Sequence, residues 1–140
     1  MTDRTPQLFA AIYAALDGDS ALAALLGGAG RVFNGVQANQ TAPYVDIGGD
    51  TAADYGTSSG DAQEHTLTVD VWTDQPTSGQ SAKRLCIQIA ARVRDILHGQ
   101  PLPMGAGNMP NLRCEFHETM RDPDGVSWHG VLRFRAVTEN

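Results

Sequence analysis

The chain has 140 residues, 41% of them hydrophobic and 19% charged, and its 10 basic and 16 acidic residues give a net charge of −6. This length suits one hydrophobic core, so we expect residues 1–140 to form a single domain. The negative net charge and the absence of a Lys/Arg cluster argue against a nucleic-acid-binding protein. Two cysteines are too few for a disulfide framework, and they lack the spacing of metal ligands. No apolar run is long enough to span a membrane. These features predict a soluble protein of a reducing compartment.

Apolar residues at helical spacing predict two helices near the N-terminus and a longer one in the middle of the chain. The first is expected to be capped by Thr5, and the second to run from a cap at Asp19 to a stop at Gly27. Residues 78–98 give the strongest helical pattern, and Ile87 lies far from its apolar stripe. A lone exposed isoleucine is usually ordinary surface, and the alternative is a contact between subunits. The side that holds Ile87 also carries Lys83, Ala91 and Arg94.

Runs of β-forming residues predict three short strands, at residues 31–33, 44–47 and 64–73. Residues 48–63 are rich in Gly, Ser, Thr, Ala and Asp, with Tyr55 as their only large side chain. We expect this stretch not to order itself, because it cannot bury enough apolar surface. A second flexible stretch, residues 100–111, carries Leu102, Met104 and Met109.

The chain ends in a predicted hairpin around residues 122–126. A three-residue loop with a type I turn and a left-handed Gly125 would pair Asp122 with Val126. A four-residue loop is rejected because it would mismatch the apolar faces of the two arms. Counting outward from the shorter loop gives the pairs Phe116 with Leu132, Glu115 with Arg133, and Cys114 with Phe134.

These elements predict an α+β fold, with a mostly antiparallel sheet and with one long helix and the N-terminal helices packed on one face. The other face is expected to be polar and rich in arginine and aromatic groups, which suits a wet interface between subunits. Its members would be Thr66, Thr68, Asp70, Trp72, Arg113, Glu115, His117, His129, Arg133 and Arg135.

A metal site is the main enzymatic alternative. In the predicted register His117 and His129 lie on one face near Glu115, and two histidines with one carboxylate can hold a metal. Glu115 has a ready partner in Arg133, however, so surface or interface histidines are the preferred interpretation; His65 and His98 are also assigned to the surface. No serine lies in a nucleophile-elbow pattern, and we expect no catalytic residues, metal or cofactor.

Seven segments in succession resemble the tail-terminator (tail-completion) family of long-tailed phages and related gene transfer agents. The similarity covers nearly the whole chain and is absent from the stretches 49–63 and 100–111. The segments are 8–16 (LFAAIYAAL), 20–26 (SALAALL), 31–36 (RVFNGV), 42–48 (APYVDIG), 65–72 (HTLTVDVW), 121–125 (RDPDG) and 129–135 (HGVLRFR).

The resemblance implies a particle protein that forms a hexameric ring at the head-proximal end of the tail tube, stops tube elongation and joins the tail to the head. Its partners would be its own copies, the major tail tube protein and a head-tail connector or stopper, with DNA passing through an acidic lumen unbound. A head-to-tail ring needs two different complementary patches. Our candidates for subunit contacts are Ile87, Lys83, Arg94, Trp72, Arg113, Arg133 and Arg135. Our candidates for tube or connector contacts are Tyr55, Asp50, Asp54, Asp61, Leu102, Met104 and Met109. Another neck or connector subunit, and a small metal-dependent enzyme, are the alternatives.

Overall fold

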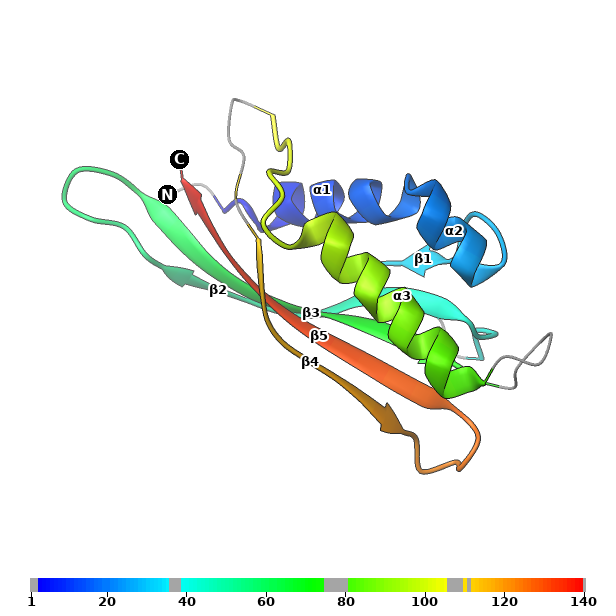
Figure 1. Ribbon diagram of the computed structural model, residues 1–140. Coiled ribbons are helices and arrows are strands. Elements are labelled where there is room, and N and C mark those ends of the chain that lie inside the picture. Colours follow the sequence, from blue (N-terminus) through cyan, green and yellow to red (C-terminus); the bar gives the residue numbers. More distant parts are fainter. Residues whose placement is uncertain (1–2, 36–38, 75–80, 106–109, 111, 140) are drawn as a thin grey trace.

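The computed structural model describes residues 3–35, 39–74, 81–105, 110 and 112–139, and it has three helices on one face of a five-stranded sheet (Figure 1). The sheet order is β1-β2-β3-β5-β4, with β1 parallel to β2 and every other pair antiparallel. The α+β class is confirmed, although the sheet is mixed and α1, at 13 residues, is nearly as long as α3, at 16. The elements are α1 (Thr5–Asp17), α2 (Ser20–Leu26), β1 (Val32–Phe33), β2 (Tyr44–Asp54), β3 (Ala62–Thr73), α3 (Ala82–Leu97), β4 (Arg113–Arg121) and β5 (Trp128–Glu139).

Local side-chain chemistry sets the helix ends. Asp19 caps α2 by accepting a 2.8 Å hydrogen bond from the Leu22 amide, and Gly27 ends that helix with φ +84°, so both predictions are confirmed. The prediction that Thr5 caps α1 is wrong. Thr5 is the first helical residue, and the Asp3 carboxylate accepts hydrogen bonds from its amide and its hydroxyl. Helix α3 begins at Ala82, after a cap by Ser81; the predicted start at 78 lies outside the described residues.

Helix α3 packs closely on the centre of the sheet. Most of its predicted apolar stripe is buried: Cys86, Ile89 and Val93 have no exposed surface, whereas Leu85 and Ile96 are partly buried against the core. Gly130 on β5 permits this approach, because a Cβ atom there would lie only 3.1 Å from the Cys86 sulfur. Burial also raises the pKa of the Cys86 thiol to about 11, so this cysteine stays protonated and unreactive at neutral pH.

Residues 48–63 are ordered, which contradicts the prediction for this stretch. Strand β2 continues to Asp54, β3 begins at Ala62, and the Thr57 amide closes the turn by donating to the Gly60 carbonyl at 2.8 Å. The stretch buries little apolar surface, and its order comes from the ladder of backbone hydrogen bonds. Residues 50–61, called the arm below, extend past the helical layer at one end of the sheet (Figure 1).

The β4–β5 hairpin confirms the left-handed Gly125, with φ +77°, but its loop is one residue longer than predicted. The Asp122 amide donates to the Ser127 carbonyl, and the ladder then pairs Phe116 with Arg133. The predicted pairs Phe116–Leu132 and Glu115–Arg133 are therefore wrong. A bulge between Cys114 and Phe116 restores the register, so that Cys114 pairs with Phe134 as expected.

Candidate assembly surfaces

The sheet face that the helices leave uncovered is the first candidate surface. Along β3 the side chains alternate between buried and half-buried, and the half-buried set faces away from the helices. Trp72, Arg133 and Arg135 lie on this uncovered face, and Arg113 joins them because it pairs directly with Arg135. The structure thus brings together the four sheet residues predicted as subunit contacts.

Trp72 and His129 form a stacked pair in the middle of the uncovered face. Their ring centroids are 3.9 Å apart with an interplanar angle of 9°, and His129 Nε2 lies 2.8 Å from Asp70 Oδ1. The three side chains come from the neighbouring strands β3 and β5. The sequence places all three residues on the polar face but does not predict their contact, which depends on the pairing of β3 with β5, two strands far apart in the chain.

A second cluster lies where the uncovered face meets the arm. Arg135 donates from Nε and Nη2 to Glu64 Oε2, at 3.0 and 2.6 Å, and its guanidinium lies 5.6 Å from the centroid of the Tyr55 ring. Arg133 lies over the Phe116 ring at 5.4 Å, and Phe116 remains 44% exposed. Arginine stacked on exposed aromatic groups is characteristic of protein interfaces.

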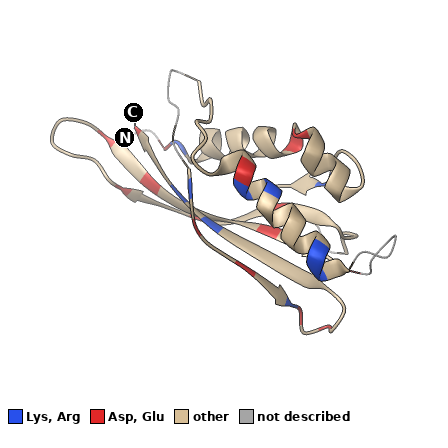
Figure 2. Cartoon of the chain, in the orientation of Figure 1, with Lys and Arg blue, Asp and Glu red and all other residues tan. Residues whose placement is uncertain are grey.

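Charge is divided between the two halves of the sheet. Residues 32–82, which include β2, β3 and the arm, carry seven acidic residues and no Lys or Arg. Residues 83–135, which include β4 and most of α3 and β5, carry eight Lys or Arg and five acidic residues. Figure 2 shows acidic residues along the β2–β3 hairpin, and both basic and acidic residues on α3 and on the β5–β4 side. The β2–β3 half is therefore acidic, whereas the edge strand β4 is balanced, with Arg113 and Arg121 against Glu115 and Glu118.

A groove between α3 and β4 is the second candidate surface. Its volume is about 650 Å³. The groove forms because α3 packs mainly on β3 and β5, while β4 lies beyond them at the edge of the sheet. Ile87 is 47% exposed and lines it, so the prediction of an isoleucine outside the core stripe is confirmed. Arg94 also lines the groove, whereas Lys83 lies 5.3 Å from the Trp128 ring on the same side of the molecule. The remaining lining residues are Ala90, Ala91, Asp95, His117, Glu118, Thr119 and Leu132.

The predicted loop contacts are scattered. Tyr55 is 53% exposed, and Asp50, Asp54 and Asp61 are exposed on the arm with it. Leu102 is only 4% exposed and belongs to the core, which leaves its side chain little surface for a partner. Met104 packs against the same core, and Met109 lies outside the described residues.

The histidines do not form a metal site. His117 pairs with Leu132 and lines the groove, whereas His129 lies on the opposite, uncovered face, so the predicted proximity of the two is wrong. Among the described residues no group of three His, Cys, Asp or Glu could hold a metal ion. His65 is also not on the surface: it is 1% exposed, and its Nε2 lies 2.8 Å from the Thr138 hydroxyl. His98 accepts the Cys114 amide at 2.8 Å through Nδ1.

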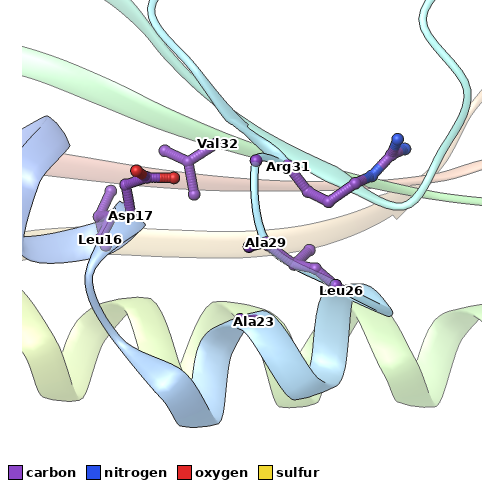
Figure 3. A pocket seen from close by; sticks show the side chains of 9 residues that line it. Leu16, Asp17, Ala23, Leu26, Ala29, Arg31 and Val32 are labelled. Carbon is purple, nitrogen blue, oxygen red and sulfur yellow. The ribbon is translucent and has the colours of Figure 1, made fainter.

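A small hollow between the N-terminal helices and β1 offers no ligand site. Its volume is about 10 Å³, which is no more than one water molecule needs. Leu16 and Val32 line it with Leu26, and Arg31 extends away from it (Figure 3). In the described part of the chain no single helix is long and apolar enough to cross a membrane, and α1 with α2 reaches that length only as a pair bent by 71°.

The uncovered sheet face and the groove have the composition of surfaces that contact other proteins. Residues 10–139 match the family described as tail completion protein gp17, and the chain belongs to this family of structural tail proteins. Its place is therefore the virion or phage-like particle. It is similar to a chain from the virion of a native gene transfer agent particle, with 27% identity and a TM-score of 0.83 over 100% of both chains. A search of curated protein sequences found no match.

Proposed function

We propose that this protein is the tail terminator of a phage-like particle. Six copies form a ring on the head-proximal end of the tail tube, which stops tube elongation and provides the surface on which the head connector docks. The observation that carries this proposal is the likeness over the full length of both chains to a component of a gene transfer agent virion, together with membership of the tail completion family. The protein acts by assembly and catalyses no reaction.

The surfaces of the subunit support a closed ring. A ring in which every subunit contacts the next in the same sense needs two different patches that complement each other. The uncovered sheet face, with its arginine and aromatic side chains, and the helix side around Ile87 are our candidates for such a pair of patches. In this arrangement the subunit contacts include Ile87, Lys83 and Arg94 on the helix side. On the uncovered face they include Trp72, Arg113, Arg133 and Arg135. The tail tube protein and the connector bind above and below the ring.

Two measurements test the proposal. The purified protein, alone or with purified tail tubes, should give a hexamer-sized annulus by light scattering and negative-stain imaging. Particles assembled without the protein should have tails of abnormal length and heads that fail to join them. Labelled protein found elsewhere than at the tail end next to the head, or normal tails in its absence, would contradict the proposal. The first of these outcomes would favour a different neck or connector component.

A further inference from the structure

We infer that neighbouring subunits of the ring join edge to edge, with the β4 edge of one subunit pairing as an antiparallel strand with the β2 edge of the next. This inference rests on the proposed ring, and it names the backbone groups that meet and their register. The partner of each edge is a second copy of this chain. The groove around Ile87 and the arginine side chains of β5 and β4 then lie on either side of the joint.

Strand β4 is an edge strand whose outward backbone groups follow from its pairing with β5. The Asp122 amide donates to the Ser127 carbonyl at 2.9 Å, which sets the alternation of the ladder next to the turn. The Cys114 amide points away from β5 as this alternation requires, and His98 Nδ1 accepts it at 2.8 Å. Within the described part of the chain no strand pairs with the outward groups beyond Cys114. They belong to His117, Thr119 and Arg121.

Strand β2 has a matching open edge on the opposite side of the sheet. Strand β1 covers this edge only at Val45 and Asp46. The Tyr55 amide donates to the Ala62 carbonyl at 2.9 Å, so the residues of β2 that face away from β3 follow from the same alternation. Residues 47–54 contain no lysine or proline, with which native proteins often protect an exposed edge. The outward residues beyond β1 are Asp50, Ala52 and Asp54.

The strand directions suit a ring. Strand β4 is antiparallel to β5, β5 to β3 and β3 to β2, so β4 and β2 run in opposite directions within one subunit. Rotation about a ring axis along the strands preserves these directions, and the β4 edge of one subunit then meets the β2 edge of the next as an antiparallel pair. The bulges at Gly48/Asp50 and Cys114/Phe116 precede the two open stretches, which are therefore regular.

One register satisfies all the outward groups. Its facing pairs are Thr119 with Ala52, Arg121 with Asp50, and His117 with Asp54 of the next subunit. Both sets of side chains lie on the helix side, because their ladder partners Leu132 and His65 are buried there, so the helices stay on one face of the extended sheet. A shift by two residues leaves one outward residue of each strand unpaired and separates both charge pairs. Backbone pairing, rather than net charge, thus selects the partner edge.

Disulfide trapping tests this register. The Ala52→Cys/Thr119→Cys variant, oxidised after ring assembly, should give a ladder of covalent species up to six chains on a non-reducing gel, because facing Cα atoms lie about 5.5 Å apart. An equimolar mixture of the two single variants should stop at dimers, since each subunit then has one introduced cysteine. The matched control is Ala52→Cys/His117→Cys, which is displaced by two positions, over about 7 Å between Cα atoms, and should give no ladder. Wild-type protein, which keeps Cys86 and Cys114, gives the background.

A charge exchange tests the same pairing in solution. Arg121→Glu or Asp50→Arg alone should raise the concentration of half-assembly about threefold to tenfold, because a facing pair of opposite charges becomes a pair of like charges. The double variant Asp50→Arg/Arg121→Glu restores opposite charges at every joint and should return to within about twofold of the wild type. Arg121 also lies 5.1 Å from the Trp128 ring of its own subunit, so the unfolding of each monomer is measured as a control. Arg84→Glu, an exposed change on α3, should alter assembly by less than about twofold.

The outcomes separate the inference from the proposed function. An Ala52→Cys/Thr119→Cys variant that forms normal rings but gives no ladder would overturn the edge pairing and leave the ring intact. A ladder of equal strength from the displaced control, or a double charge variant that stays as weak as the single ones, would overturn the register. Wild-type protein that forms no ring, even on tail tubes, would overturn the proposed function itself.

Discussion

The contact between Gly130 and Cys86 gives the sharpest prediction about stability. A Cβ atom at Gly130 would lie 3.1 Å from the Cys86 sulfur and 3.4 Å from the Val71 Cβ. Favourable carbon–sulfur contact requires roughly 3.7 Å, so Gly130→Ala forces α3 and β5 apart by about half an ångström. Overpacking of this kind costs about 1–3 kcal/mol, and replacing a strand glycine by alanine returns about 0.5–1 kcal/mol. We expect a net loss of about 1–2 kcal/mol in the free energy of unfolding.

A double-mutant cycle isolates the steric cause. Cys86→Ala removes the sulfur and leaves a small cavity, which alone should cost about 1 kcal/mol. The Gly130→Ala/Cys86→Ala variant should be more stable than the sum of the single losses allows, by about 0.5–1.5 kcal/mol, because the new methyl group fills the vacated space. Chemical denaturation at a concentration where the protein is monomeric gives the three differences, and an unchanged m value confirms two-state behaviour. Additivity within about 0.5 kcal/mol would refute the argument from the close approach.

Three further changes test single features of the fold. Gly125→Val should lower the free energy of unfolding by about 1–2 kcal/mol, because Gly125 has a positive φ that valine resists. Gly60, whose φ is not in the left-handed region, is the control: Gly60→Val should change the free energy of unfolding far less, and equal losses would contradict the turn. Asp19→Ala should cost about 1–2 kcal/mol by removing the cap of α2, and Asp19→Asn, which keeps the cap and weakens only the ion pair with Arg92, should cost less. Burial lowers the pKa of His65 below its ordinary 6.5, so below that pH the unfolded chain binds a proton that the folded chain does not. Stability should therefore decline as the pH falls below about 6.5, and His65→Gln should flatten this part of the unfolding-versus-pH curve.

Features that depend only on residues close together in the sequence were predictable. The caps at Asp19 and Gly27, the apolar stripe of α3 and the exposed Ile87 follow from hydrogen bonding and helical periodicity alone. The groove around Ile87 was not predictable, because it needs the position of β4 relative to the helix. The order of the arm was missed for a related reason: composition measures apolar burial, whereas the arm is held by pairing between β2 and β3.

The β4–β5 hairpin shows how one residue changes the chemistry of the site. The four-residue loop shifts the whole ladder by one position, and an alternating strand then exchanges its two faces. As a result Phe116 points to the uncovered face beside Arg133, and His117 turns into the groove opposite Leu132. The bulge after Cys114 reverses the exchange, so that Cys114 keeps its place against the core beside Phe134. Matching of apolar faces therefore predicts the pairing of Cys114, which packs against the core, and mispredicts the pairing at Phe116 and beyond, where residues 115–118 are exposed. The groove is polar on its β4 side because of this shift, and its apolar lining comes mainly from α3, so Ile87 is our first candidate among its lining residues for a contact between subunits.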